Sequence, residues 1–267
     1  MGLGKIYTIA NQKGGVGKTT TAINLGAYLG QFGQRVLIID IDPQANATSC
    51  LGIDKNSVKG GAYDVLIGAQ TIMTQILHNP KFKISLLPSS PALAGAEIEL
   101  ISMENRGNRL QNVLESIRTR YDYILIDCPP SLGLLTLNGL VAAQDGLLIP
   151  VQCEYLALEG LGQLMQTIAR VKNSLFSNLS IRGVILTMYD ARTNLAADVV
   201  AEVKQAFSGK VFETLIPRSI RLAEAPSYGM PISVFAPGST GAQAYQLLAK
   251  ELLQKDNVGE SIIQEAI

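Results

Sequence analysis

The chain contains 267 residues, of which 47% are hydrophobic and 16% charged, a composition that suits the large core of a single α/β domain. Lys and Arg together number 22, as do Asp and Glu, so the overall charge gives no indication of a nucleic-acid partner, and any DNA contact must come from a local patch. Cys50, Cys128 and Cys153 show no Cys-x-x-Cys spacing, and we expect reduced, buried thiols in a cytoplasmic protein. Neither a signal peptide nor a membrane span is expected, because no apolar stretch reaches transmembrane length.

Apolar, strand-like runs alternate with helical ones along the chain. Runs such as Val36–Ile39 and Ile124–Ile126 are continuously apolar, as strands buried on both faces must be. The predicted strands are Lys5–Asn11, Arg35–Asp40, Lys83–Leu87, Tyr121–Asp127, Gly146–Val151, Arg182–Tyr189 and Val211–Ile216. The predicted helices are Thr19–Phe32, Pro91–Met103, Arg106–Arg120, Leu134–Ala143, Leu156–Leu175, Asn194–Phe207 and Thr240–Gln254.

This alternation predicts an α/β fold: a mostly parallel, twisted sheet of about seven to eight strands with helices on both faces. We find no internal repeat, and no linker rich in Pro, Gly or Ser divides the chain, so one domain over residues 1–267 is expected. Residues 255–267 read as a C-terminal tail that frays or packs on a neighbour.

A glycine-rich loop joins the first predicted strand to the first predicted helix. Glycines let backbone N–H groups turn inward around an anion, and the N-terminus of the helix adds its positive dipole end. Lys18 is placed to reach the β- and γ-phosphates of a nucleoside triphosphate, and the Thr19 hydroxyl to hold Mg²⁺. The loop reads Lys13-Gly14-Gly15-Val16-Gly17-Lys18-Thr19-Thr20.

Aspartates follow two of the apolar strands, where ligands of an open parallel sheet sit. The second strand ends in Asp40-Ile41-Asp42-Pro43, and period two predicts that both carboxylates lie on one side of it. Asp127 ends the fourth strand, as a Walker-B carboxylate that holds Mg²⁺ does. A single strand-end aspartate is commonly a turn former, but three of them beside a phosphate-binding loop predict a metal–triphosphate site.

The loop departs from the ordinary pattern, because Gln12 stands where the first glycine is usual and Lys13 precedes two glycines. This K-G-G-x-x-K-T form resembles the deviant loop of the ParA/MinD family of P-loop ATPases. By that resemblance Lys13 crosses a homodimer interface, which forms with ATP, to touch the partner's phosphates. A cation inserted from outside stabilises charge on the transferring phosphoryl group.

Asp40-x-Asp42-Pro43-Gln44 and Ile126-Asp127-Cys128-Pro129-Pro130 also resemble segments of this family. The resemblance implies that Asp40 orients the attacking water, that Asp42 supports the metal region, and that Asp127 with Thr19 holds Mg²⁺. It implies a Mg²⁺-dependent ATPase of weak intrinsic activity that a partner stimulates.

Three further segments, Val151–Gly160, Leu186–Asn194 and Ile216–Gly229, resemble the chromosomal, Soj-like branch of ParA proteins. In that branch the segment after the last main strand frames the adenine, which implies Pro217, Arg218 and Ser219 here. Arg192 and Arg221 match the surface that binds double-stranded DNA without sequence preference in the ATP dimer. Arginine–phosphate contacts would supply such sequence-blind affinity. The branch also implies a stimulating protein of the ParB type and association with the nucleoid.

Other readings stay open at this point. A MinD-like ATPase that selects a membrane site shares the loop, but it needs a basic amphipathic C-terminal helix, and this tail is acidic, so no stable membrane attachment is expected. An ATPase that positions protein assemblies, an iron–sulfur relative and a biosynthetic amidoligase are further alternatives, although an amidoligase has no use for Lys13. His78, the single histidine, is expected in a surface loop at a helix end.

Overall fold

The computed structural model describes residues 2–155 and 157–256, and its sheet has seven strands in the order β3-β4-β2-β5-β1-β6-β7. All neighbouring strands pair in parallel except β3, which lies antiparallel to β4 at one edge. The strands are β1 (Lys5–Ile9), β2 (Val36–Asp40), β3 (Leu77–Asn79), β4 (Ile84–Leu87), β5 (Tyr123–Asp127), β6 (Gly146–Gln152) and β7 (Ile181–Thr187). The expected α/β fold, with its mostly parallel sheet, is confirmed.

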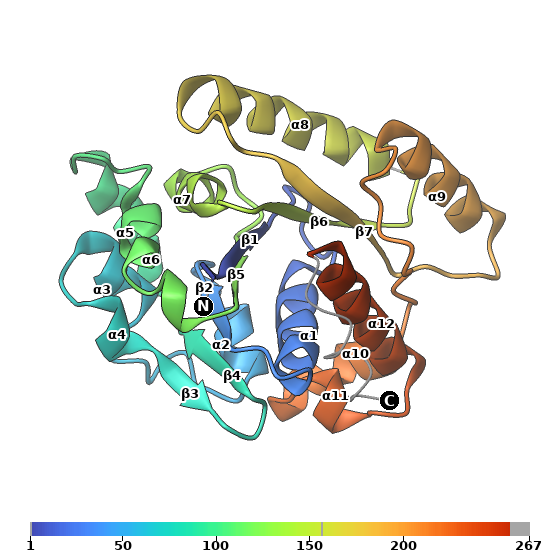
Figure 1. Ribbon diagram of the computed structural model, residues 1–267, viewed down its shortest axis with the longest axis horizontal. Helices are drawn as coiled ribbons and strands as arrows, with labels where there is room; N and C mark the ends of the chain where they lie inside the picture. The colour runs from blue at the N-terminus through green and yellow to red at the C-terminus, as the bar shows by residue number, and fades with distance from the viewer. Residues whose placement is uncertain (1, 156, 257–267) are drawn as a thin grey trace.

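Helices cover both faces of this sheet (Figure 1). Two of the longer ones begin at a side-chain cap: the hydroxyl of Thr193 accepts from the N–H of Ala196, and that of Ser239 from the N–H of Ala242. The α-helices are α1 (Lys18–Gln31), α2 (Asn46–Cys50), α3 (Ala62–Ile67), α4 (Ile72–Gln75), α5 (Leu93–Ile101), α6 (Arg109–Glu115), α7 (Leu134–Ala142), α8 (Ala157–Ser174), α9 (Asn194–Ala206), α10 (Ile220–Glu224), α11 (Ile232–Phe235) and α12 (Thr240–Lys255). Two short 3₁₀ helices complete the set, η1 (Arg118–Arg120) and η2 (Ala225–Tyr228).

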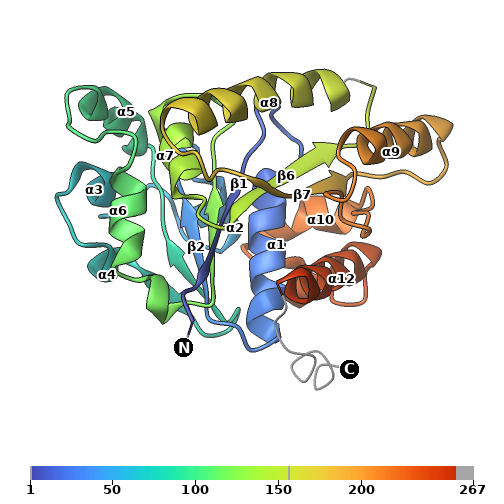
Figure 2. The same ribbon diagram turned by 45° about the horizontal axis from the view of Figure 1, so that its top comes forward.

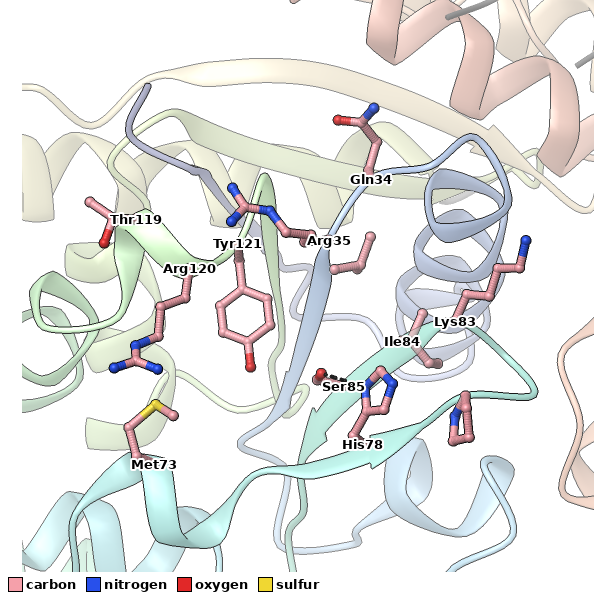
Figure 3. A pocket seen from close by; sticks show the side chains of 12 residues that line it. Gln34, Arg35, Met73, His78, Lys83, Ile84, Ser85, Thr119, Arg120 and Tyr121 are labelled. Atoms are coloured by element: carbon pink, nitrogen blue, oxygen red, sulfur yellow. Dashed lines mark hydrogen bonds between the residues drawn. The ribbon is translucent and has the colours of Figure 1, made fainter. Parts of the chain in front are cut away.

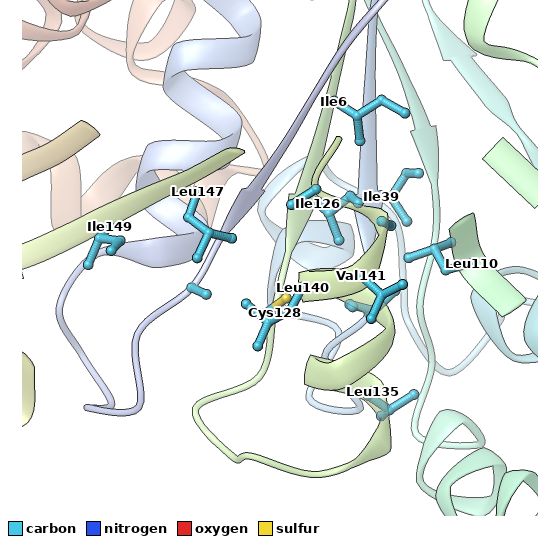
Figure 4. Close-up of a cluster of buried hydrophobic side chains, with 14 of the residues drawn as sticks. Ile6, Ile39, Leu110, Ile126, Cys128, Leu135, Leu140, Val141, Leu147 and Ile149 are labelled. Carbon is cyan, nitrogen blue, oxygen red and sulfur yellow. The ribbon is translucent and has the colours of Figure 1, made fainter. Parts of the chain in front are cut away.

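Two apolar cores lie on either side of the sheet, because successive residues of a strand point to opposite faces. In β2, Leu37 and Ile39 pack under α5, α6 and α7, in the core shown in Figure 4. Val36 and Ile38 of the same strand pack under α1 and α12. Every residue of β2 and of β5 is buried, which explains their unbroken apolar sequences.

The register of the central strands brings the functional strand ends together. Ile9 at the end of β1 pairs with Asp127 of β5, and Asp127 pairs in turn with Asp40 of β2. The loop that follows β1 therefore begins beside both aspartates, at the carboxyl edge of the sheet.

The segment Val211–Ile216 is not the strand that its apolar sequence predicts. It runs beside β7 with isolated bridges at Val211 and Pro217, and the N–H groups of Phe212 and Ile216 donate to carbonyls of β7. Between these bridges the carboxylate of Glu251 on α12 accepts from the backbone N–H groups of Glu213 and Thr214, at 2.9 and 3.1 Å. Because a side chain holds these N–H groups, they do not join a ladder.

Other differences concern short elements. His78 lies in β3, an edge strand of three largely exposed residues whose sequence carries no apolar run, and not in the expected loop. The helix predicted over Arg106–Arg120 is divided into α6 and η1, and α2, α3, α4, α10 and α11 are too short to show a period in the sequence. No helix of the described residues is long and apolar enough to cross a membrane. Of the expected tail, residues 257–267 lie outside the described residues.

Asp256, which follows α12, joins this helix to the sheet. Its carboxylate accepts from the hydroxyls of Tyr7 and Tyr123, at 2.7 and 3.0 Å, and forms a 2.6 Å ion pair with Arg182 of β7. Burial, together with the charge of Asp256, raises the pKa of both tyrosines, so the phenols remain donors. The carboxylate is only 3% exposed and therefore depends on these partners.

We predict that Asp256→Ala lowers the free energy of unfolding by about 3 kcal/mol, because it leaves the partly buried Arg182 and two phenols without their acceptor. Urea unfolding checks this, with Asp198→Ala on the exposed face of α9 as the matched control, expected within about 0.5 kcal/mol of the parent. Equal unfolding midpoints for the two variants would contradict the proposed anchor.

Candidate functional site

The loop between β1 and α1 has the backbone geometry of an anion cradle. Gly15 and Gly17 have φ of 75° and 89°, in the left-handed region that glycine tolerates best. No side chain caps the N-terminus of α1, so the N–H groups of its first turn remain available for a ligand. The side chain of Asn11 accepts from the N–H of Lys13 at 3.0 Å and holds the entry to the loop.

A cavity of about 340 Å³ lies over this loop. It is lined by six of the eight predicted loop residues, Gly14, Gly15, Gly17, Lys18, Thr19 and Thr20, together with Asp42, Gln44, Asn46, Cys50, Pro130 and Met188. Val16 is buried instead, and its carbonyl accepts from the hydroxyl of Thr187 at 2.9 Å. That bond fastens the loop to the end of β7.

A second cavity, of about 310 Å³, shares Gly17, Thr20 and Met188 with the first. Pro217, Arg218 and Ser219, the residues expected around adenine, line it together with apolar groups that include Leu222 and Tyr245. The two cavities are therefore adjacent, in the order that the phosphates and the base of a nucleotide require. Met188, at their junction, has a φ of 52°, a strained backbone that the neighbouring contacts must hold in place.

Lys18 is buried at 7% exposure, and its ammonium donates to the carbonyl of Lys13 at 3.2 Å. Burial lowers the pKa of Lys18, while the nearby Asp127 opposes this shift. The charged lysine thus lies among carboxylates on the floor of the cavity. Its positive charge would attract phosphates at a place where two buried carboxylates would otherwise repel them.

Thr19 and Asp127 are in direct contact. The Thr19 hydroxyl donates to Asp127 Oδ2 at 2.7 Å, whereas Asp127 Oδ1 is buried and has no hydrogen-bond partner within the described part of the chain. Burial, and next the charge of Asp40, raises the pKa of Asp127 well above its ordinary value. An orphaned carboxylate oxygen beside a threonine hydroxyl fits Mg²⁺, which takes few protein oxygens and keeps waters and phosphates as its other ligands. Among the described residues, no group of three or more His, Cys, Asp or Glu side chains is arranged to hold a metal ion.

Asp40 and Asp42 occupy different positions, and the expected division of roles does not fit the geometry. Asp40 is fully buried and does not line the cavity: Oδ1 accepts from the N–H of Asp42 at 3.1 Å, and Oδ2 from the hydroxyl and N–H of Thr48, at 2.7 and 2.8 Å. Burial raises the pKa of Asp40 to about 6, against these hydrogen bonds. Asp42 lines the cavity, with Oδ1 accepting from the N–H of Gln44. The strand ends at Asp40, so the period-two argument does not extend to Asp42.

Lys13 lies at the rim, not among the residues lining either cavity. Its ammonium is 3.5 Å from Glu154, and the other carboxylate oxygen of Glu154 is 3.6 Å from Arg218. Gln152 also donates to Glu154. Glu154 thus links the loop lysine to the segment expected around adenine, a contact that the sequence did not reveal although Glu154 lies two residues after the end of β6.

The two arginines expected to bind DNA are both at the surface and both paired with neighbouring acids. Arg192 is 86% exposed and makes a two-point contact with Asp190, at 2.7 and 2.8 Å. Arg221, 61% exposed, lies 2.9 Å from Glu224. To bind a DNA phosphate, each arginine must therefore give up its contact with the neighbouring carboxylate.

The sequence assigned no role in the cavity to four of its lining residues. Gln44 lies in the turn into α2 and Pro130 in the turn after β5, and both belong to the family-like segments; Asn46 and Cys50 are the first and last residues of α2. Their positions after strands at the carboxyl edge were the available signal, but nothing local says which turn residues face inward.

Comparison with known proteins gives the same picture. A family model described as an AAA domain matches residues 4–181. The sporulation initiation inhibitor protein Soj of Bacillus subtilis is 54% identical over 94% of this chain and 98% of its own length. The chain belongs to the ParA/Soj family of P-loop ATPases. The chromosome partitioning protein ParA of Myxococcus xanthus is 49% identical over 95% of this chain and 89% of its own.

One solved structure that is similar to this ParA/Soj chain contains a bound nucleotide analogue. The cobyrinic acid a,c-diamide synthase of Mycobacterium smegmatis, crystallised with an ATP analogue and magnesium, is 35% identical, has a TM-score of 0.84 and covers 97% of this chain and 98% of its own. Its fold therefore matches the present one almost throughout.

We predict that Lys18→Ala weakens ATP binding by about 3 kcal/mol, or roughly a hundredfold in Kd, because the phosphates then meet the buried carboxylates without the ammonium of Lys18 between them. Equilibrium binding of a fluorescent ATP analogue measures this. Lys172→Ala, on the exposed face of α8, is the matched control and should bind as the parent does. Undiminished binding by the Lys18 variant would remove the lysine from the site.

Proposed function

We propose that this protein is an ATP-dependent partitioning ATPase that dimerises with ATP–Mg²⁺ bound, coats DNA as a dimer and leaves it after hydrolysis. The observation that carries the proposal is the Thr19–Asp127 contact under a glycine-rich loop, with one carboxylate oxygen unpartnered, beside two adjoining cavities. The partitioning role follows from the Soj and ParA relatives.

ATP fits the paired cavities with its phosphates over Gly14–Thr20 and its base beside Pro217–Ser219. Thr19 and Asp127 are the residues that would hold Mg²⁺, with Asp42 near it, and Mg²⁺ would neutralise charge on the phosphates. The carbonyl of Pro217 offers an acceptor to the exocyclic amine of adenine, since proline has no N–H. Lys18 binds and orients the β- and γ-phosphates.

We assign the water-positioning role to Asp42 and a supporting role to Asp40. Asp42 reaches the cavity, whereas both oxygens of Asp40 are already committed to Thr48 and to the backbone of Asp42. Asp40 thereby fixes the turn that presents Asp42. Placement of the attacking water matters more than basicity, because phosphoryl transfer depends mainly on positioning and electrostatics.

Lys13 is proposed to leave Glu154 and reach the phosphates of a second copy. Its contact with Glu154 is a partly exposed pair at 3.5 Å, of the kind that contributes at most about 1 kcal/mol, so it is readily exchanged. Two chains then close face to face over two nucleotides, each lysine completing the other's site.

Dimerisation would bring together two copies of the surface that carries Arg192 and Arg221. Two patches of a neutral chain on one dimer bind DNA phosphates more tightly than one, which makes DNA binding depend on ATP. Association with the nucleoid, and release by a ParB-type protein that stimulates hydrolysis, complete the proposed cycle. The cargo of this cycle is a chromosome, a plasmid or a protein assembly. Assays of DNA and liposome binding, each with ATP and ADP, distinguish the DNA-based cycle from MinD-like site selection at a membrane.

We predict that Asp42→Ala abolishes ATP hydrolysis while ATP-driven dimerisation persists, because the attacking water loses the residue that positions it and Lys13, Lys18 and Thr19 are all retained. Asp40→Asn retains the shape of the buried side chain and is the matched variant at the same strand end; it should hydrolyse ATP within about tenfold of the parent rate and lose stability. Steady-state ATPase assays and sizing in solution separate the two. Normal turnover by Asp42→Ala, with turnover abolished in a folded Asp40→Asn, would return the role to Asp40.

We predict that Lys13→Gln retains ATP binding but stays monomeric with ATP, and so loses at least tenfold in affinity for nonspecific duplex DNA. Sizing with ATP, ADP and no nucleotide, followed by a DNA mobility shift, measures both steps. Arg221→Glu is the complementary control: it should dimerise as the parent does and bind DNA more weakly. A dimeric, hydrolysing Lys13→Gln with full DNA affinity would reduce the protein to a simple nucleotide binder.

A further inference from the structure

A hollow of about 640 Å³ lies at the other end of the strands from the nucleotide site, and it is about as large as the two nucleotide cavities together. It opens beside the amino ends of β2 and β4 and beside the chain that leads from η1 into β5 (Figure 3). The aspartates and the glycine-rich loop are at the opposite, carboxyl ends of these strands. The hollow is therefore separate from the site described above.

The charged residues that line this hollow are all basic: Arg35, Lys83 and Arg120 line it, and no Asp or Glu does. His78 lines it as well. Arg35 is neutralised by Asp122, which accepts from its guanidinium at 2.7 and 3.1 Å. Within the described ranges neither Arg120 nor Lys83 forms an ion pair.

Arg120 is the better placed of these two cations. In Figure 3 its guanidinium lies on the Met73 side of the hollow that Tyr121 also lines, whereas the side chain of Lys83 stands at the rim and points away from the Tyr121 ring. A guanidinium presents a planar fork of donors that matches a carboxylate or phosphate by two parallel hydrogen bonds. Arg120 thus offers an anion-binding group with no acidic partner in this part of the structure.

The rest of the lining is mainly apolar, with a few polar groups that are held in place. Tyr121 is half-buried, and its ring stands in the hollow between Arg120 and His78 (Figure 3). The imidazole of His78 is held by Ser85, whose hydroxyl lies 3.2 Å from Nδ1. Met73 and Ile84 add apolar surface. A concave, mainly apolar wall with a few polar groups is typical of small-molecule sites.

The wall that Lys83 contributes is rigid. Lys83 has a φ of 56°, which a lysine adopts only when its surroundings compel it. A Cβ added at Gly30 of α1 would come within 2.4 Å of the Lys83 carbonyl, so the helix packs directly on this turn. This wall is therefore preformed, which lowers the ordering cost that a ligand would bear there.

We propose that this hollow binds a small organic anion, with a phosphate or carboxylate head on Arg120 and a flat apolar body against Tyr121. The size of the hollow suits a ligand comparable to a nucleotide, and its charge excludes cations. The site is independent of the proposed ATPase cycle, since it shares no residue with either nucleotide cavity.

The test is calorimetric titration of the full chain, saturated with ADP–Mg²⁺ so that the nucleotide site is filled. Phenyl phosphate and benzoate are the probes, one for each head group, and at least one should bind saturably with one site per chain. Inorganic phosphate, which lacks the flat body, should bind at least tenfold more weakly than phenyl phosphate. Arg120→Gln should weaken the bound probe at least tenfold, and Tyr121→Leu should weaken it while retaining apolar packing.

Arg170→Gln, an exposed arginine of α8, is the matched control and should bind the probe as the parent does. Unchanged ADP affinity in every variant shows that each is folded. Absence of saturable binding by both probes overturns the proposal, as does equal binding by the parent and Arg120→Gln. A loss of duplex DNA affinity in Arg120→Gln, without any probe binding to the parent, would make this surface a DNA contact instead.

Discussion

The site depends on the parallel register of three strands. Because β5 lies between β1 and β2, Ile9, Asp127 and Asp40 come level at one edge of the sheet, and the glycine-rich loop starts directly beside both acids. A shift of one residue between β1 and β5 would turn Asp127 to the opposite face relative to Thr19, and a shift between β2 and β5 would do the same to Asp40 relative to Asp127. The buried, apolar strands make that shift costly, so the core on both faces of the sheet maintains the site.

The same burial leaves negative charge in the site that is only partly compensated, and a ligand can supply the missing positive charge. Asp40 and Asp127 are both fully buried, and each has a raised pKa because desolvation disfavours its charge. Thr48, Thr19 and backbone N–H groups stabilise part of this charge, and Lys18 adds one cation. The proposed metal and the proposed lysine of a second copy would both supply positive charge at this point. Compensation of the same negative charge would therefore link nucleotide binding to dimerisation.

Much of the fold could be predicted from the sequence pattern, because β2, β5 and β6 contain continuous apolar runs, as strands buried on both faces do, and helical runs alternate with them. Prediction failed where a distant group decided the outcome. Val211–Ile216 has a strand's sequence, but Glu251 on α12 holds two of its N–H groups. The turn after Asp40 places Asp42 in the cavity and Asp40 beneath it, which a spacing of two residues cannot show.

The sequence by itself determined the chemistry: a strand–loop–helix unit that cradles phosphate, acids at two strand ends and an additional lysine, because these depend on local backbone geometry and residue type. Only the tertiary structure decided which acid faces the cavity, that Glu154 holds Lys13 and Arg218, and that Arg120 and Tyr121 border a second hollow. These are contacts between segments far apart in the chain, and they are set by strand order, register and helix packing, none of which any one segment encodes.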